Sequence, residues 1–186
     1  FSMEIVPAPL EVEDFLPLFA GAFFRYSYEA TPTGGETETG EGVDEVTGVT
    51  VESPITWYEM SGDGPIGAFC GDNVCELGLN PSGGDAPLRV TTSSLVAVTS
   101  VLKEPIEVGT SWTDFVSFVT FQWEIVEVLD SLVVEGVTYD TVVHVRGTVS
   151  ASNGTLDLYF AEGVGIVRYL ADSDDGTAAY DLIESG

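Results

Sequence analysis

The alternation of apolar and polar residues constrains the fold of this chain more than any other feature. In residues 138–149, TYDTVVHVRGTV, one set of alternate side chains is mostly apolar and the other is mostly polar. Because successive side chains of a strand point to opposite faces, this pattern predicts a strand with one buried face and one wet face. Similar runs recur between clusters of Gly, Pro, Asn and Asp. We predict further strands at 23–30, 43–51, 55–60, 65–70, 74–79, 87–98, 111–119, 120–130, 155–161, 164–171 and 177–184.

Helical periodicity is weak, and the best helix candidate is a short turn around residues 10–16, which Pro17 ends. Many short strands with little helix indicate an all-β antiparallel domain. The chain has 186 residues, of which 44% are hydrophobic, and this length favours a single domain over residues 1–186. Residues 31–45 begin as a run of Thr, Gly and Glu, which we expect to form a flexible acidic loop.

The two halves of the chain echo each other. The pattern Pro-Leu/Ile-x-x-Gly-x-x-Phe/Trp starts at Pro17 and again at Pro105, 88 positions later. Gly-Val-Thr recurs at the same offset, and FCGDNVCEL lies over YFAEGVGIV at an offset of 90. These matches predict an internal duplication, at approximately 15–98 and 103–186, in which each half is a meander. Together the halves would form a curved sheet, a half-barrel or a sandwich.

The charge balance excludes several kinds of partner. The chain carries 5 basic and 31 acidic residues, a formal net charge of −26. Such a surface repels phosphate backbones, so we expect no nucleic-acid binding, and it disfavours anionic membranes. Salt would screen the repulsion among the carboxylates, so a salt-adapted source and an acidic secreted protein both fit. No apolar run approaches the ~20 residues that span a bilayer, so we predict no transmembrane segment.

Cys70 and Cys75 bear on the compartment. A two-residue turn at Asp72-Asn73 would set the cysteines opposite each other in a hairpin, where a disulfide can form. The alternatives are two free buried thiols or half of a metal site, although the chain offers one His and no further Cys as soft ligands. A disulfide favours an oxidising compartment. Because Phe-Ser precedes Met3, we expect a mature domain whose targeting segment was removed, either secreted or anchored at an N-terminus that this chain lacks.

Catalytic and metal-binding patterns are weak. His144 is the single histidine, so a Ser-His-Asp or Cys-His device would need it, and Asp140 on the same strand face could orient the ring. No nucleophile motif accompanies this pair, and an exposed strand histidine is the simpler interpretation. Among 31 acidic residues no carboxylate pair is informative, and ADSDDG at 171–176 puts Ala171 where a calcium loop needs its first Asp. We expect no catalytic residue, no metal and no cofactor.

Aromatic residues are the best candidates for ligand binding. A curved sheet can form an apolar concavity, and tryptophan and tyrosine side chains on its strands could line it. The alternative is a packed core, which aromatic strands commonly form. A cavity lined by the tryptophans would separate the two interpretations. The candidate ligand-binding residues are Trp57, Trp112, Trp123, Tyr26 and Tyr58.

Four segments together carry a family resemblance: FLPLFAGAFFRYSY, EPIEVGTSWTDF, YFAEGVGIVRY and the hairpin RYLADSDDGTAAYDLIE. They resemble a broad group of bacterial secreted or lipid-anchored proteins of unknown role. More loosely, the pattern is similar to the half-barrels of lipoprotein carriers, which hold acyl chains in an apolar concavity. The resemblance implies an extracytoplasmic all-β domain, whether secreted, periplasmic or anchored at the cell surface. It implies no catalytic residues, and this chain departs from the pattern in its cysteine pair and its acidity.

We therefore expect a non-enzymatic extracytoplasmic protein that binds an apolar small molecule or a protein of the cell envelope. The first alternative is a structural or interaction module whose core is completely filled. The second is a hydrolase that uses acidic residues, which would require carboxyl groups converging in a cleft with raised pKa values.

Overall fold

The computed structural model describes residues 8–186 except 71–72, 94, 117–118 and 151–152. Within these residues the chain forms twelve strands, a short 3₁₀ helix η1 (Val12–Phe15) and a short helix α1 (Pro65–Cys70). The strands are β1 (Phe23–Pro32), β2 (Glu38–Glu52), β3 (Ile55–Gly62), β4 (Val74–Leu79), β5 (Asp85–Thr91), β6 (Val96–Lys103), β7 (Ser111–Val116), β8 (Val119–Val134), β9 (Val137–Val149), β10 (Gly154–Ala161), β11 (Gly165–Ser173) and β12 (Gly176–Ser185).

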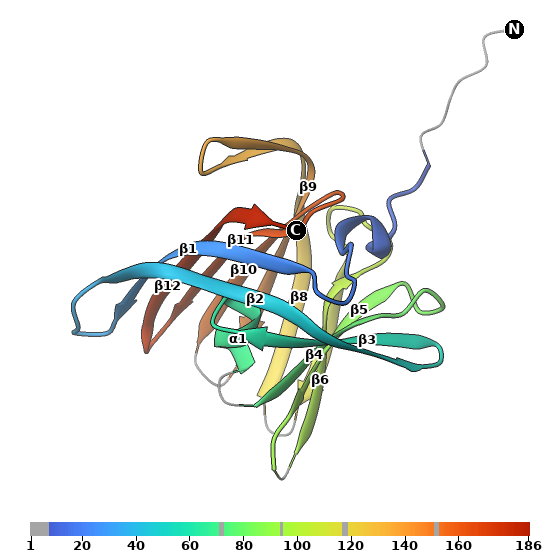
Figure 1. Cartoon of the computed structure of the whole chain (residues 1–186), viewed down its shortest axis with the longest axis horizontal. Helices are drawn as coiled ribbons and strands as arrows, with labels where there is room; N and C mark the ends of the chain where they lie inside the picture. Colours follow the sequence, from blue (N-terminus) through green and yellow to red (C-terminus); the bar gives the residue numbers. More distant parts are fainter. Residues whose placement is uncertain (1–7, 71–72, 94, 117–118, 151–152) are drawn as a thin grey trace, which may run out of the picture.

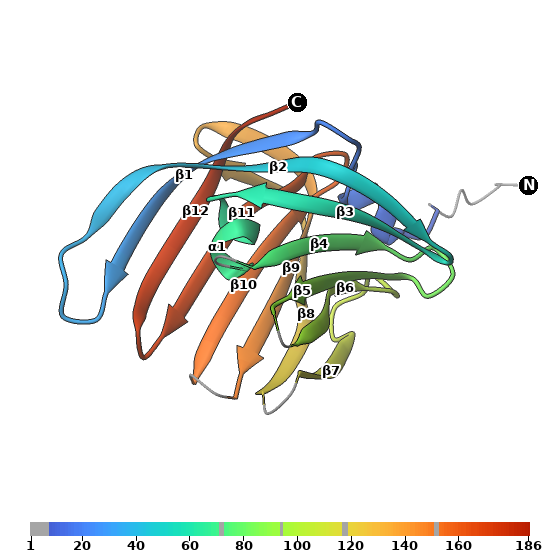
Figure 2. The same ribbon diagram turned by 60° about the horizontal axis from the view of Figure 1, so that its bottom comes forward.

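All of these strands belong to one antiparallel sheet in the order β6-β5-β4-β3-β2-β1-β12-β11-β10-β9-β8-β7. Strands β1–β6 form one meander and β7–β12 a second, and the pairing of β1 with β12 joins them. The two edges, β6 and β7, are consecutive in the chain, and the sheet curls until they approach each other in a nearly closed barrel (Figures 1 and 2). The predicted all-β antiparallel fold is confirmed, and the internal duplication stays a prediction.

The alternation in the sequence reappears as alternation of burial. Leu156, Leu158 and Phe160 on β10 point into the core, and Asp157 between them points outward. The outer face is also covered in one place, because the end of the β8–β9 hairpin bends over the sheet (Figure 1). Glu135 at its tip accepts a hydrogen bond of 3.2 Å from the Ser27 hydroxyl of β1.

Three predicted segments differ from the structure. The strand predicted at 87–98 is two strands, because the hydroxyl and the backbone N–H of Thr92 both donate to the Leu95 carbonyl, and the same hydroxyl accepts a hydrogen bond from the Leu95 N–H. The acidic loop predicted at 31–45 is mostly strand, since β1 runs to Pro32 and β2 begins at Glu38. The third segment is 65–70, which is helical rather than extended.

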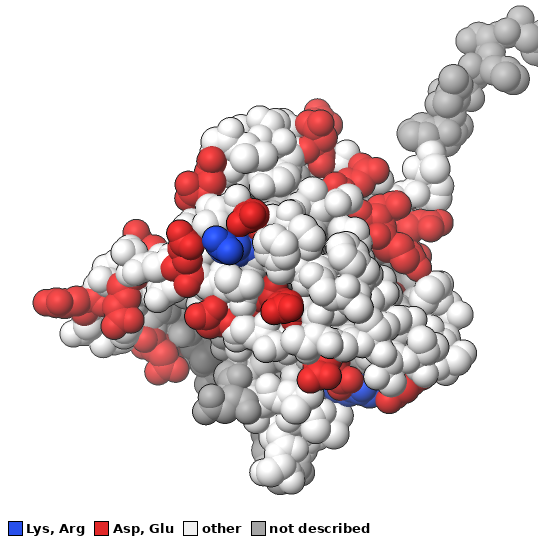
Figure 3. Space-filling model, viewed as in Figure 1, with Lys and Arg blue, Asp and Glu red and all other residues white. Residues whose placement is uncertain are grey.

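Acidic side chains dominate much of the molecular surface. Figure 3 shows them over the upper and lateral parts of one face, while the lower end, where the β5–β6 hairpin projects, carries no charged group in this view. This distribution agrees with the sequence, because no acidic residue lies between Asp85 and Glu104. The net charge of −26 is therefore unevenly spread over the fold.

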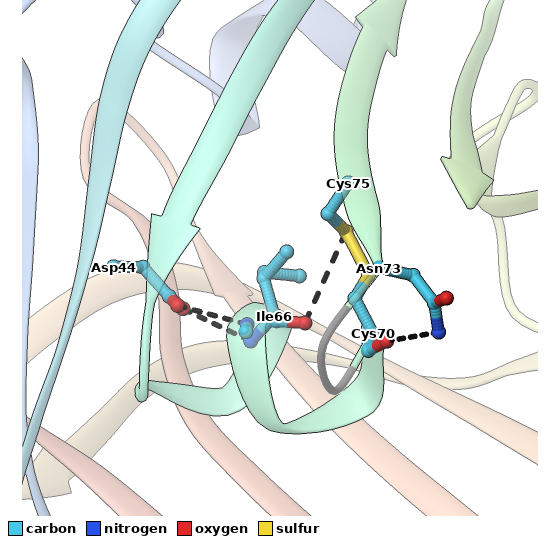
Figure 4. Close-up of a disulfide and its surroundings, with 6 residues drawn as sticks. Asp44, Ile66, Cys70, Asn73 and Cys75 are labelled. Carbon is cyan, nitrogen blue, oxygen red and sulfur yellow. Dashed lines mark hydrogen bonds between the residues drawn. A yellow bond between two sulfur atoms is a disulfide. The ribbon is translucent and has the colours of Figure 1, made fainter. Parts of the chain in front are cut away.

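Helix α1 lies between the two halves of the curved sheet. It contacts β2, β3 and β4, and the ring of Phe69 lies 6.4 Å from that of Phe121 on β8. A disulfide joins Cys70 at its end to Cys75 on β4, with the two Cα atoms 5.9 Å apart (Figure 4). The predicted disulfide is present, but the predicted hairpin geometry is wrong, because Cys70 ends a helix; Asp72 lies outside the described residues.

Candidate functional site

Among the described residues, the two edges of the sheet are held together by side chains instead of a backbone ladder. The Asp114 carboxylate on β7 accepts hydrogen bonds from the Ser100 N–H (2.8 Å) and the Thr99 hydroxyl (2.9 Å) of β6. The Trp112 indole donates to the Ser100 carbonyl at 2.7 Å, and the Trp123 indole donates to the Thr99 hydroxyl at 2.9 Å. Both backbone groups of Ser100, which a neighbouring strand would otherwise engage, are thus satisfied. We call this contact the seam.

The structure brings Trp112 and Trp123 together at the seam. Their rings are stacked with centroids 6.4 Å apart, and the Phe121 ring also stacks on that of Trp123, with centroids 6.2 Å apart. Gly147 on β9 makes room for this stack, because a Cβ there would lie 2.5 Å from the Trp123 ring. These two of the five candidate ligand-binding residues therefore support the closure of the sheet.

The other three candidates lie elsewhere. Tyr26 is buried in the core, where its hydroxyl donates to the Ile166 carbonyl at 3.0 Å, and Tyr58 packs half-buried against the same core. Trp57 is buried outside the core cluster, under the Arg89 guanidinium, whose carbon lies 4.0 Å from the ring centroid. Trp57 points to the outer face because it pairs with Gly78 of β4. Gly78 lies between Leu77 and Leu79, which face the core, so Gly78 and its partner face outward.

A small cavity lies in the interior beside Tyr26. A cavity of about 20 Å³ lies among the side chains of Leu16, Tyr26, Asp44, Met60 and Leu77. This volume holds about one water molecule and is far too small for an acyl chain. Burial raises the pKa of Asp44 to about 6, although hydrogen bonds from backbone N–H groups lower it. None of the three tryptophans lines this cavity.

A polar groove lies on the outer face of β7–β10, beside the seam. It consists of two adjoining hollows of about 320 and 450 Å³, which share Gln122 and Thr148. The first hollow is lined by Ser111, Trp112, Thr113, Gln122, Trp123, Glu124, Arg146 and Thr148. The second is lined by Thr120, Gln122, Thr148, Val149, Ser150, Asn153, Gly154 and Thr155. We call the two together the outer groove.

The register of the sheet sets hydroxyl and amide groups side by side in this groove. Thr113 pairs with Gln122, Gln122 pairs with Thr148, and Thr148 pairs with Thr155, so the four form one row across β7, β8, β9 and β10. Neighbouring residues in such a row have Cβ atoms about 4.5–5.5 Å apart. Among the described residues, none of these four side chains makes a hydrogen bond within the protein. The row therefore offers donors and acceptors to a ligand.

His144 belongs to a neighbouring cluster on the outer face. Its Nε2 lies 2.6 Å from Asp157 Oδ1, and its ring stacks on Tyr159 with centroids 4.2 Å apart. Arg146 Nε donates to the same Asp157 oxygen at 2.8 Å, and this bond raises the pKa of the guanidinium. Two predictions are wrong here. The His144 side chain was predicted to be exposed but is buried, with 7% exposure, and its carboxylate partner is Asp157 and not Asp140. The cluster fixes the Arg146 side chain at one end of the outer groove.

In the part of the chain that the structure describes, no group of three or more His, Cys, Asp or Glu side chains could hold a metal ion. The Asp-rich segment at 171–176 forms the end of β11 and the turn into β12. Among the same residues, no helix is long and apolar enough to cross a membrane.

No protein-family model matches the chain, and no curated protein matches it. A solved structure with a similar outline is that of a Bacteroides fragilis protein, thought to be exported, with a YmcC-like fold. It is 10% identical in sequence, the match covers 92% of this chain and 98% of that one, and the TM-score is 0.47. A likeness of this size supports no argument about function. The motif resemblance to secreted and lipid-anchored proteins stays a prediction.

The outer groove was not anticipated from the sequence. Its strands were predicted, but their register depends on the bulge between Ile125 and Glu127 and on turns that the sequence does not specify. One signal was available, since no charged residue lies between Asp114 and Glu124 in a chain with 31 acidic residues. In so acidic a protein, a stretch without charge indicates a surface that is not simply exposed to solvent as the acidic surfaces are.

Proposed function

We propose that this protein is a non-enzymatic binding protein of the extracytoplasmic space, and that it binds a neutral, hydroxyl-rich partner in the outer groove. Such a partner is a saccharide chain of the cell envelope. The observation that carries the proposal is the row of Thr113, Gln122, Thr148 and Thr155, whose side chains have no hydrogen-bond partner among the described residues.

The chemistry of the groove favours a neutral ligand. Hydroxyl and amide side chains both donate and accept hydrogen bonds, as do the hydroxyl groups of a sugar. An anionic ligand would be repelled by a protein of net charge −26, and a cationic one would be drawn to the acidic surfaces instead. Glu124 and Arg146 stand at one end, where they can orient a polar ligand without giving the groove a net charge.

An exposed aromatic ring flanks the groove. Phe115 is 78% exposed and pairs with Thr120, which lines the second hollow. Because Phe115 is two residues from Thr113 on β7, both side chains lie on the outer face. A phenyl ring beside a row of hydroxyl groups can pack against the C–H face of a sugar ring while the hydroxyl groups bind its edge.

The compartment is supported by the disulfide between Cys70 and Cys75, which persists in oxidising surroundings. The apolar-ligand interpretation is less favoured, because the cavity among the core side chains measures only about 20 Å³. A carrier role would require the two halves of the sheet to separate around α1.

Titration calorimetry with neutral oligosaccharides of glucose, galactose and N-acetylglucosamine tests the proposal. We expect at least one to bind, and Thr148→Val to weaken that binding about 3- to 10-fold, because one hydrogen bond contributes about 0.5–1.5 kcal/mol. The matched control is Thr50→Val, an exposed threonine on β2 outside the groove, which should bind as the wild type does. Absence of binding throughout the panel, or equal loss in both variants, would contradict the proposal.

A further inference from the structure

The turn from β9 to β10 carries a sequence pattern that the proposed function does not use. Residues 153–155 read Asn-Gly-Thr, which is the pattern Asn-x-Ser/Thr with x other than proline. In proteins that leave the cytoplasm, this pattern marks an asparagine that can carry an oligosaccharide on its side-chain nitrogen. The segment 80–82, Asn-Pro-Ser, fails because of its proline, and 73–75, Asn-Val-Cys, lacks the hydroxyl residue. Asn153 is therefore the one asparagine of the chain that the pattern admits.

The structure leaves the Asn153 side chain accessible. Asn153 is exposed, and β9 ends and β10 begins at the lower rim of the barrel in Figure 2. Its amide nitrogen donates to the exposed Asp174 carboxylate at 3.4 Å, which is longer than an ordinary N–H···O bond. The amide nitrogens of Asn73 and Asn80 instead donate hydrogen bonds of 2.8 Å that hold their own turns. Of the three asparagines, Asn153 is thus the one whose nitrogen is available for reaction.

Turn geometry explains Asn153 but does not explain Thr155. Asn153 has a φ of 47°, in the left-handed region that Asn, Asp and Gly adopt most readily, so the turn alone favours an asparagine. Thr155 lies beyond the turn, on β10, and its hydroxyl makes no hydrogen bond with any described residue. The turn needs no hydroxyl group at this position, whereas the glycosylation pattern requires one.

We propose that Asn153 is an acceptor site for an N-linked oligosaccharide. The donor is an oligosaccharide carried on a lipid phosphate or pyrophosphate. In the transfer, Asn153 Nδ2 forms a bond to the anomeric carbon of the first sugar and releases one proton. The bond from that carbon to the phosphate oxygen breaks, and the lipid phosphate leaves with the electron pair. The step consumes no oxidant or reductant.

The surroundings of Asn153 suit a bulky, neutral substituent. Asn153 lines one end of the 450 Å³ hollow on the outer face, so an attached sugar displaces no core side chain. The disulfide between Cys70 and Cys75 is consistent with the same oxidising compartment outside the cytoplasm. The inference goes beyond the proposed saccharide binding and does not rest on it, because the modification is covalent and needs no ligand in the groove.

Mass spectrometry of the protein from its natural host tests this inference. We expect an intact mass above that of the sequence, and a proteolytic peptide containing Asn153 that releases sugar fragments. Thr155→Val should abolish the added mass and Thr155→Ser should keep it, because serine also satisfies the pattern. The matched control is Ser82→Ala, an exposed hydroxyl residue two positions after Asn80, which should leave the added mass unchanged.

Asn153→Gly provides a second disruption, because glycine tolerates the left-handed turn; it should lose the added mass and keep the circular dichroism of the wild type. An unmodified mass in the protein from its natural host would overturn the inference. Added mass that persists in Thr155→Val, or that lies on another residue, would also overturn it. Saccharide binding is measured on protein produced without glycosylation, so a failure there contradicts the proposed function alone.

Discussion

At the scale of single residues, Asp44 shows how one buried carboxylate decides a local structure. It is 1% exposed, and its two oxygens accept hydrogen bonds of 2.9 Å from the N–H groups of Ile66 and Gly67 (Figure 4). The first N–H groups of a helix have no partner within it, so an acceptor at this place favours a helix over a strand. Pro65 at the first helical position acts in the same direction.

The raised pKa of Asp44 predicts a specific dependence of stability on pH. Burial shifts this pKa from 3.8 to about 6, so the folded state binds the proton more tightly than the unfolded state between those values. The contribution of Asp44 to the free energy of unfolding is therefore highest below pH 4 and falls as the pH rises to about 6, by about 2–3 kcal/mol. Urea unfolding at pH 4 and pH 7 measures it.

Asp44→Asn isolates this effect from the other acidic groups, because the amide does not titrate. The stability of the wild type relative to the variant should fall by that amount between pH 4 and pH 7. A difference that stays constant, or grows with pH, would show that Asp44 ionises in the folded state at least as easily as in the unfolded one.

At the scale of elements, the seam differs from the other strand contacts of the sheet. Neighbouring strands elsewhere are joined by a backbone ladder, whereas β6 is joined to β7 through Asp114 and the Trp112 indole, and to β8 through the Trp123 indole. A junction of this kind depends on a few side chains, so a single substitution can open it. The outer groove lies beside this junction and needs β7 in place.

Asp114→Ala should therefore destabilise the protein by about 1–3 kcal/mol, because it leaves the part-buried Ser100 N–H and the Thr99 hydroxyl without an acceptor. Amide hydrogen exchange should accelerate most in β6 and β7. Asp130→Ala, which removes an exposed acid from β8, is the control and should change stability little. If the two variants unfold at the same urea concentration, the seam does not depend on Asp114.

At the scale of the whole molecule, the alternation of residues predicted most of the sheet, because one face of nearly every strand is buried. The predicted secondary structure was wrong where contacts with residues outside the segment, or a single side chain, determine the local conformation. Residues 65–70 are apolar and short, so their periodicity does not separate a strand from a helix, and Asp44 on β2 together with Pro65 favours the helix. The turn within 87–98 depends on the Thr92 side chain, in a segment without Gly or Pro after Pro87.

The candidate site was predicted less well than the fold. Five aromatic residues were grouped by type, and the structure separates them into the seam, the core and the outer face. Side-chain type indicates burial, but only the register and closure of the sheet show which buried rings meet. The charge-free stretch at 115–123 is a better signal, because in a chain of net charge −26 a neutral segment has to be explained.

The central claim is that the protein binds a neutral saccharide on its outer face and holds no lipid in its interior. Native mass spectrometry of the disulfide-bonded protein, after exposure to a mixed lipid extract and separately to neutral oligosaccharides, tests it most directly. We predict a discrete oligosaccharide adduct that Thr148→Val weakens, and an unchanged protein mass after lipid exposure. A lipid adduct that is lost on denaturation, with no oligosaccharide adduct, would contradict this claim and would indicate that the binding site lies in the interior.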